Sequence, residues 1–200
     1  MISLPATTVH ADELGDAIAS LQHEWAHIKY EMPEDKQAEP FESLAARAHQ
    51  VSQKFPGKAE PLIWEAIIKS TLAGAKGGFG ALGLMKEARD LLLAAEKIDP
   101  KAMNGSIYTS LGSFYYMTPG WPIGFGDDDK AGEYLKKALA IAPNDMDANF
   151  FTGDFWLDQK KYKKAIPYLE KVLALPDVPD RPVYSRGRKA EAAEKLALAK

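Results

Sequence analysis

Four prolines, Pro56, Pro100, Pro143 and Pro176, each follow a short amphipathic run, and they constrain the fold of this sequence more than any other feature. The prolines are separated by 44, 43 and 33 residues. Because proline cannot continue a helix, each is expected to mark the end of one. The last separation is close to the roughly 34 residues of a repeated helix–turn–helix unit that ends near a proline. The two longer separations fit the same unit if each repeat carries extra residues between its two helices.

The side chains before each proline follow a common pattern of small and bulky residues. Spacings of four and three place these residues on one face of a helix. The small ones, Gly112, Gly153, Ala88, Ala131 and Ala165, are expected to let neighbouring helices approach closely. The matching positions are Leu44, Ala48 and Val51; Trp64, Ile67, Ala88, Leu92, Ala95 and Ile98; Tyr108, Leu111, Gly112, Tyr115, Ala131, Leu135, Ala138 and Ile141; and Asn149, Thr152, Gly153, Trp156, Tyr162, Ala165, Leu169, Val172 and Leu175.

This pattern resembles the tetratricopeptide repeat superfamily over roughly residues 12–176, strongly in the last two repeats and weakly in the first. The resemblance predicts an all-α fold, a right-handed array of about four antiparallel helix pairs; an unrelated helical bundle is the alternative. Residues 1–11 are then a disordered tail or the remnant of a signal peptide. Residues 177–200 are a linker, Asp177–Arg188, followed by a capping helix, Lys189–Lys200, because a helical array needs a terminal cap with a polar outer face.

The extra residues of the two long repeats lie between their two helices, in Gly74–Gly83 and in Thr118–Asp128. We expect two long loops that emerge on one edge of the stack. Helix pairs with long, aromatic, Gly-rich loops resemble the T-component of tripartite ATP-independent periplasmic (TRAP) transporters, and Tyr115–Ala131 and Leu62–Ala75 carry most of the likeness. The resemblance implies a periplasmic helical protein that accompanies a substrate-binding protein and has no catalytic motif. The lack of a lipoprotein-type cysteine departs from that family.

A repeat scaffold of this kind predicts binding rather than catalysis, so we expect no catalytic residue and no cofactor. Helix positions that conventionally line the concave surface of such an array mix charged and aromatic residues, which suits a groove for a protein partner or a small apolar ligand. Under the TRAP resemblance the partner would be a TRAP substrate-binding protein. The predicted groove residues are Glu65, Lys69, Thr109, Ser113, Tyr116, Trp121, Phe125, Phe150 and Asp154.

The long aromatic loop has two interpretations: it packs on its own helices, or it closes over the groove. We expect Trp121 to anchor the loop, and Phe125 and Tyr116 to face the groove. The second functional hypothesis is a cytoplasmic module that recognises peptide termini, which needs a basic clamp. Lys69 is the only basic residue of the predicted groove, so this hypothesis has little support.

A metallohydrolase is the third hypothesis, because His23-Glu24-Trp25-Ala26-His27 matches the H-E-x-x-H pattern of zinc proteases. On a helix the two histidines would lie one turn apart, with Glu24 as general base. The apolar stripe of that helix, however, falls on the opposite face, and no strand is predicted that could hold a substrate. His49 in the next helix is the only candidate third histidine nearby. We therefore predict no metal site, and keep His23 and His27 as weak candidates.

Two further motifs have structural explanations. Asp127-Asp128-Asp129 precedes a predicted helix, where acidic residues cap free N–H groups and complement the helix dipole. The alternative, a calcium site, lacks the alternating ligands of a calcium loop. The Gly-rich run Gly74–Gly83 lacks the Lys-Ser/Thr ending of a phosphate-binding loop and follows no strand, so phosphate binding is not expected.

Composition restricts partners and location. The chain has 200 residues, a net charge of −3 and no cysteine, which excludes disulfides and thiolate metal sites and gives no basic field for nucleic acid. No apolar run approaches the roughly 18 residues of a membrane span. Val9-His10-Ala11 before Asp12 has the small residues that signal peptidase accepts, so we expect a periplasmic protein whose signal peptide begins upstream of Met1. A cytoplasmic protein with a disordered tail is the alternative.

Overall fold

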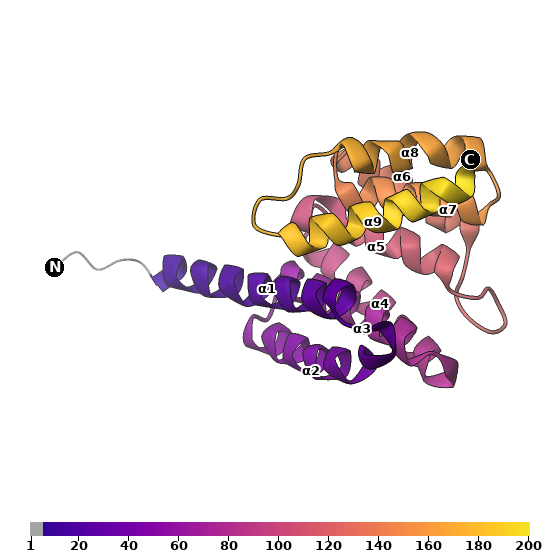
Figure 1. Cartoon of the computed structure of the whole chain (residues 1–200). Coiled ribbons are helices and arrows are strands. Elements are labelled where there is room, and N and C mark those ends of the chain that lie inside the picture. Colours follow the sequence, from indigo (N-terminus) through magenta and orange to yellow (C-terminus); the bar gives the residue numbers. More distant parts are fainter. Residues whose placement is uncertain (1–5) are drawn as a thin grey trace.

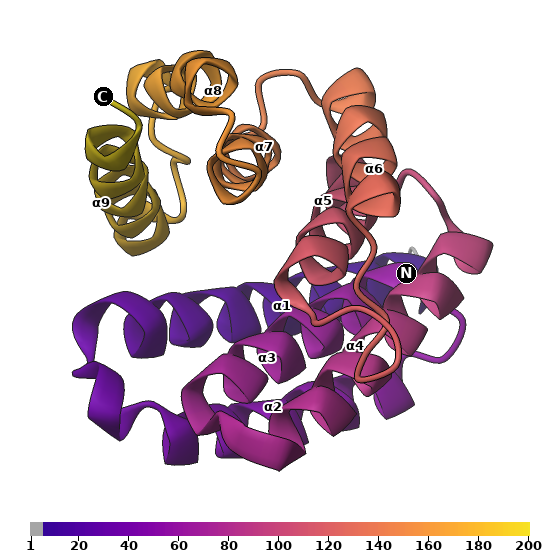
Figure 2. The same cartoon turned by 90° about the vertical axis from the view of Figure 1, so that its right-hand side faces the viewer.

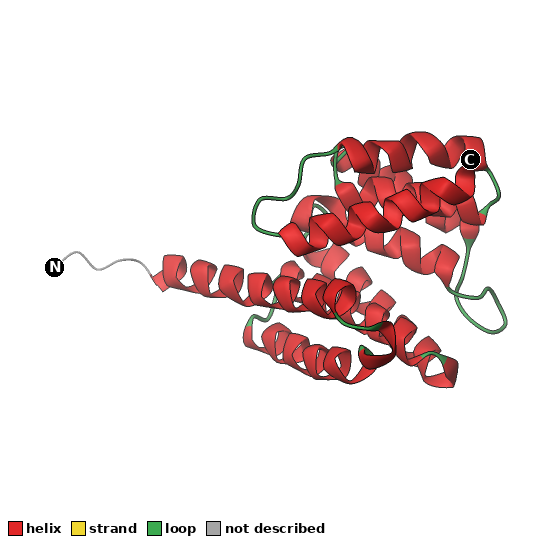
Figure 3. Ribbon diagram, in the orientation of Figure 1, coloured by secondary structure: helices red, strands yellow, loops and turns green. Residues whose placement is uncertain are grey.

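The computed structural model describes residues 6–200, with side chains except those of residues 6–12 and Phe79. Within this range the chain forms nine α-helices, one short 3₁₀ helix and no β-strand (Figure 3). The helices are α1 (Ala6–Glu31), α2 (Ala38–Lys54), α3 (Ala59–Lys76), α4 (Gly78–Ile98), α5 (Ala102–Met117), α6 (Asp128–Ile141), α7 (Met146–Asp158), α8 (Tyr162–Ala174) and α9 (Pro182–Ala199). The predicted tail of residues 1–11 lies partly outside the described range, because residues 1–5 are not described. From Ala6 onward the same segment belongs to α1.

Consecutive helices form antiparallel pairs, α1 with α2, α3 with α4, α5 with α6 and α7 with α8, and α9 packs against α8 (Figure 1). Pro100, Pro143 and Pro176 follow the second helix of their pairs within two residues, as the spacing predicted. The all-α array of about four pairs with a C-terminal capping helix is therefore confirmed.

Small residues bring the helices of a pair together, also as predicted. A Cβ added to Gly112 on α5 would lie 2.7 Å from Leu135 Cγ on α6, and one added to Gly153 on α7 would lie 2.7 Å from Leu169 Cγ on α8. Both leucines are buried in the core. The glycines therefore allow each leucine to pack directly on the backbone of the neighbouring helix.

The predicted loop in Gly74–Gly83 is wrong, because the extra residues of the second repeat lengthen its helices instead. Helix α3 runs to Lys76 and α4 begins at Gly78, so that Gly77 alone separates them. Gly77 and Gly78 have φ values of 60° and 66°, which reverse the chain in a conformation that favours glycine. The predicted linker Asp177–Arg188 is also too long. Pro182 occupies the first turn of α9, where its missing N–H costs no hydrogen bond, and Arg188 therefore lies within the helix.

The last helix closes the array onto its first helix. Helix α9 contacts α1 and α7 as well as α8, and the first helices of successive pairs contact one another in the order α1, α3, α5 and α7. The contacts of these five helices close into a ring (Figure 2). The contact between α9 and α1 is close, because a Cβ at Gly187 would overlap the ring of Tyr30.

Replacing Gly187 by alanine is expected to destabilise the protein by about 1–3 kcal/mol, the usual cost of overpacking a tight contact. The added methyl group has no space unless α9 moves away from Tyr30. Gly132→Ala on α6 is the matched control. Its Cβ would lie 3.7 Å from a ring carbon of Phe155, an ordinary contact, so this variant is expected to gain about 0.5–1 kcal/mol from helix propensity. Urea unfolding measures both, and an equal response of the two variants would contradict the close α1–α9 contact.

Candidate functional site

The inner helices line two adjoining chambers that are partly open to solvent. The small chamber, of about 630 Å³, is lined by residues from the N-terminal parts of α5, α7 and α9 and from the middle of α3. The large chamber, of about 950 Å³, is lined by the C-terminal parts of α3 and α5, by α7 and by the second half of α9. The residues that line both chambers are Trp25, Ser70, Thr71, Ser113, Phe114, Phe151 and Arg188. The chambers therefore adjoin one another at the inner helices, and form the candidate binding site.

The structure places four of the predicted groove residues on the chamber walls. Thr109 lines the small chamber, Ser113 lines both, and Phe150 and Asp154 line the large one. These residues come from α5 and α7, the two helices in which the repeat pattern is strongest. The sequence pattern therefore identified the inner face of these helices.

Two predicted residues of α3 lie on another face of the helix. Glu65 is 1% exposed, and its Oε1 lies 3.0 Å from His49 Nδ1 of α2 and 3.5 Å from Lys69 Nζ. Lys69 also pairs with Glu87 of α4 at 2.7 Å. These contacts hold α2, α3 and α4 together, and neither Glu65 nor Lys69 lines a chamber.

Tyr116 connects inner helices rather than facing a ligand. Its hydroxyl donates a hydrogen bond of 2.8 Å to Asp154 Oδ2, and Asp154 Oδ1 lies 2.6 Å from Lys195 Nζ of α9. Burial, with the charge of Asp154, raises the pKa of Tyr116 well above its usual value. Tyr116 therefore stays neutral and fastens α5 to α7, while Lys195 extends the connection to α9.

The predicted roles of Trp121 and Phe125 in the long loop are reversed. Trp121 is 90% exposed and anchors nothing. Phe125 instead packs edge-on against Tyr115, with ring centroids 5.5 Å apart, and beneath the guanidinium of Arg89 at 4.6 Å. Two backbone hydrogen bonds of 2.9 Å, from Gly126 N to Pro119 O and from Asp127 N to Tyr115 O, fix the loop to itself and to α5. The loop is therefore anchored through Phe125 and presents Trp121 to solvent.

This arrangement predicts unequal effects on stability. Phe125→Ala is expected to cost about 1–2 kcal/mol, because a partly buried phenylalanine contributes less than the roughly 1.5–3 kcal/mol of a fully buried one. Trp121→Ala is expected to change the free energy of unfolding by less than about 0.5 kcal/mol, as for other exposed positions. Thermal melts of both variants measure the difference, and a larger loss in Trp121→Ala would show that the indole is packed.

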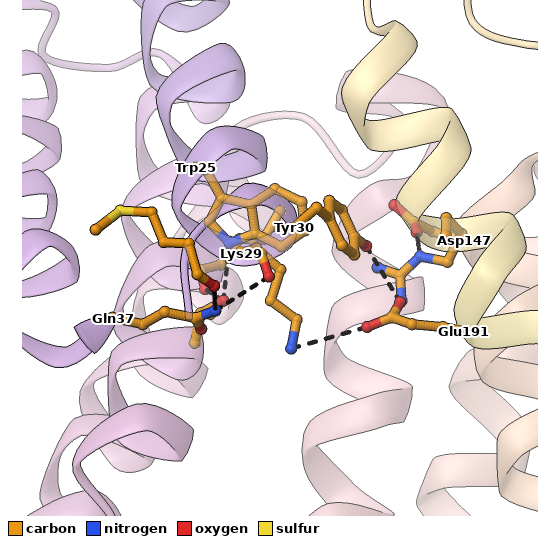
Figure 4. A network of polar contacts seen from close by, with 10 residues as sticks. Trp25, Lys29, Tyr30, Gln37, Asp147 and Glu191 are labelled. Atoms are coloured by element: carbon orange, nitrogen blue, oxygen red, sulfur yellow. Dashed lines mark hydrogen bonds and ion pairs between the residues drawn. The ribbon is translucent and has the colours of Figure 1, made fainter. Parts of the chain in front are cut away.

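An ionic network around the buried Arg188, which the sequence reasoning missed, joins α1, α7 and α9 (Figure 4). Arg188 Nη1 donates to Glu191 Oε2 at 2.6 Å. Arg188 Nε lies 2.8 Å from Asp147 Oδ1, and these two atoms form an ion pair whose geometry is not that of a hydrogen bond. From α1, Tyr30 donates to Glu191 Oε2 at 3.1 Å, and Lys29 lies 3.8 Å from Glu191 Oε1. In the sequence, the one local indication that α9 begins this early is Pro182, which is followed by a run without proline.

Two aspartates at helix ends have opposite electrostatic surroundings. Asp127 caps α6, as predicted, and its hydrogen bond from the backbone N–H of Lys130 lowers its pKa. Asp145 caps α7 by accepting from the N–H of Ala148 at 2.8 Å, but burial and then the charge of Asp147 raise its pKa to about 6. The negative charge of Asp145 is therefore poorly compensated in the folded protein.

The two histidines of the H-E-x-x-H pattern make separate contacts. His23 Nε2 lies 2.8 Å from the carbonyl oxygen of Asp180, and His27 Nδ1 lies 2.8 Å from Glu31 Oε2. Glu24, the proposed general base, pairs with Arg47. Among the described residues no three His, Cys, Asp or Glu side chains gather where they could hold a metal ion. Of the helices described here, none has the length and apolar character needed to cross a membrane.

The repeated helix pairs and their close glycine contacts define a helical repeat protein, and comparison with known proteins shows that its fold is similar to that of tetratricopeptide repeat proteins. A tetratricopeptide repeat family model matches residues 123–145. The crystal structure of TTC0263, a thermophilic tetratricopeptide repeat protein of Thermus thermophilus, has a similar fold, with a TM-score of 0.58, 18% identity and coverage of 93% of this chain and 95% of that one. The structure of MamA matches with a TM-score of 0.44 and 19% identity, over 80% and 86% of the two chains. No curated protein matches the sequence significantly. The predicted likeness to TRAP T-components finds no support in these comparisons.

Proposed function

We propose that the protein is a non-catalytic binding scaffold, and that a partner protein docks at the mouth of its large chamber. Tetratricopeptide repeat folds typically serve as protein-interaction scaffolds. The observation that carries the proposal is the exposed indole of Trp121, which lies in the chain between Pro119 and Ile123, two residues that line the large chamber. Met117 and Ile123, which line the large chamber, are 60% and 67% exposed and extend the apolar surface. Exposed aromatic and apolar side chains grouped at one opening are typical of interaction sites.

The loop that carries Trp121 is ordered before any partner arrives. A Cβ at Gly124 would overlap the carbonyl oxygen of Pro119, and one at Gly126 would overlap that of Thr118, so both glycines allow a tight fold of the backbone. With Phe125 packed on Tyr115, the backbone that carries Trp121 is held in place. Little backbone entropy is then lost on binding, which favours affinity.

The setting that we propose is the periplasm, with a TRAP substrate-binding protein as the partner. The long aromatic loop and the candidate cleavage site Val9-His10-Ala11 support this setting. The alternative, a cytoplasmic module that binds peptide termini, loses its candidate basic residue, because Lys69 is already paired with Glu65 and Glu87.

A photo-reactive amino acid at position 121, expressed in the native host, tests the docking site. We expect one protein to be crosslinked at position 121 and not at position 198, where the 72% exposed Leu198 of α9 serves as the control site. The purified partner is then expected to bind Trp121→Ala about 30-fold more weakly than the native protein, the scale of an interface hot spot of 2 kcal/mol. Equal crosslinking at both sites, or unchanged affinity of the variant, would contradict the docking site. A cytoplasmic partner would contradict the periplasmic setting alone.

A further inference from the structure

The small chamber contains buried hydrogen-bond donors that have no partner. Trp64 is 4% exposed, and its indole N–H has no acceptor. Arg181 Nε is also buried and has no hydrogen-bond partner among the described residues. Both side chains line the small chamber. Because a buried donor without an acceptor is unfavourable for folding, their common location indicates an acceptor that the protein itself does not supply.

The same chamber contains an unpaired cation. Within the described part of the chain, no carboxylate lies within 4.0 Å of Arg181, the residue that caps α9. Its guanidinium carbon lies 4.0 Å from the ring centroid of Tyr184 and 5.3 Å from that of Trp64, so the charge is held against both rings. The N-terminal parts of α5, α7 and α9 add the positive ends of their dipoles on this side of the ring. These groups together are arranged to receive a carboxylate.

The opposite charge is also present and also unpaired. Three aspartates line the small chamber, but Asp147 is paired with Arg188 and Asp177 with Lys189, at 2.8 and 2.6 Å. Asp145 has no cation within 4.0 Å among the described residues, and accepts only backbone hydrogen bonds. Arg181 and Asp145 do not pair with each other either, so the chamber keeps one free cation and one free anion.

The two free charges line the same chamber. Arg181 lies against the rings of Tyr184 and Trp64, and Asp145 caps α7, whose first turn forms part of the same wall. A ligand with two adjacent opposite charges would satisfy both residues at once.

We propose that the small chamber binds a free α-amino acid with an apolar or aromatic side chain. Its carboxylate contacts Arg181 and the indole N–H of Trp64, and its ammonium group faces Asp145. The side chain lies against the aromatic residues Trp25, Phe114 and Phe151, which also line the chamber. The chamber volume of about 630 Å³ falls within the roughly 300–1,000 Å³ typical of small-molecule sites. This inference rests on the proposed function of a non-catalytic binding protein and assigns a ligand to the small chamber, which adjoins the large one.

A zwitterion fits these charges better than a simple anion does. A bare carboxylate would compensate Arg181 but would leave Asp145 as an unpaired anion in a partly buried position, and would repel it. A bare ammonium ion would leave Arg181 unpaired for the same reason. Only a ligand that carries both charges leaves none of the charged groups of the chamber without a partner.

Isothermal titration calorimetry at pH 7.5 tests the proposal with three molecules that share one skeleton. L-Phenylalanine carries both charges, 3-phenylpropionate lacks the ammonium group, and phenethylamine lacks the carboxylate. We expect L-phenylalanine to bind, and each analogue to bind at least tenfold more weakly. Arg181→Gln is expected to bind L-phenylalanine no more tightly than the native protein binds phenethylamine. Asp145→Asn, which keeps a good helix cap, is expected to bind L-phenylalanine no more tightly than the native protein binds 3-phenylpropionate.

Arg186→Gln is the control and is expected to bind L-phenylalanine as the native protein does, because Arg186 is exposed on α9 and lies outside the small chamber. Binding of 3-phenylpropionate as tight as that of L-phenylalanine would overturn the proposal in favour of an anion site. Failure of all twenty L-amino acids to bind would overturn it entirely. The crosslinking experiment at position 121 is read separately, so loss of either the amino-acid site or the docking site leaves the other standing.

Discussion

Arg188→Met is expected to lower the free energy of unfolding by about 3–5 kcal/mol, the cost of removing one partner from a buried ionic network. The variant keeps most of the side-chain volume but leaves Asp147 without its cation and Glu191 with Lys29 alone. Burial alone would lower the pKa of Arg188, but the neighbouring Asp147, Tyr30 and Glu191 raise it above its usual value, so the native guanidinium stays charged. It also packs over the ring of Phe150 at 4.3 Å, which adds contact area to the loss. Urea unfolding at pH 7 measures the effect.

Arg186→Met is the matched control, two residues earlier on the same helix. The Arg186 side chain is 65% exposed and its nearest acid, Glu31, lies 3.6 Å away, so we expect a change within about 0.5 kcal/mol. Adding Asp147→Asn and Glu191→Gln to Arg188→Met should recover part of the stability, because the uncompensated charges are then gone. A loss in Arg188→Met no larger than in Arg186→Met would show that the network contributes nothing to the α1–α9 contact.

The free energy of unfolding is expected to decrease as the pH rises from about 4 to about 6, because of Asp145. Its pKa is about 6 in the folded protein against 3.8 for a free aspartate, so in this window the folded state binds more protons than the unfolded state. Unfolding free energy then decreases as the pH rises, by up to about 3 kcal/mol for a shift of this size. Asp145→Asn removes the contribution, so the difference in unfolding free energy between variant and native protein should grow across the window and stay constant above it.

Asp127→Asn provides a control of opposite sign. The folded-state pKa of Asp127 is lowered, so its contribution to stability is present above the unfolded pKa and is lost as the pH falls. The variant should therefore lose stability relative to the native protein at neutral pH and approach it in acid. The same sign of pH dependence in both variants would contradict the assignment of a poorly compensated charge to Asp145.

Local periodicity predicted the helix pairs because the residues that pack within a pair lie close together in the sequence. Gly112 with Leu135 and Gly153 with Leu169 illustrate this, since each glycine precedes its leucine by one helix and one connection. The glycines around Gly77 were misread for a related reason. Composition marks where a chain can turn, but not how many residues the turn takes, and the alanine and leucine residues on either side propagate the helices.

The candidate site was less predictable, because its decisive contacts join distant parts of the chain. Tyr30 and Glu191 are separated by 161 positions, and no spacing rule connects them. Arg188 lies in a stretch rich in Pro, Asp and Arg, which favours a linker when it is judged by composition alone. In the long loop, the position of Arg89 on α4 decided that Phe125 is packed and Trp121 is not, and neither sequence neighbourhood contains that information.

The closure of α9 onto α1 determines how this protein can vary in length. An open repeat array can gain or lose a unit without disturbing the others, because each unit contacts only its neighbours. Here a duplicated helix pair inserted anywhere between α2 and α9 would carry α9 past Tyr30 and break the ring. The number of units is thus fixed by geometry, and the chain cannot evolve by repeat duplication while it keeps this contact. The end units are also tied to each other, so neither should fray before the whole ring unfolds.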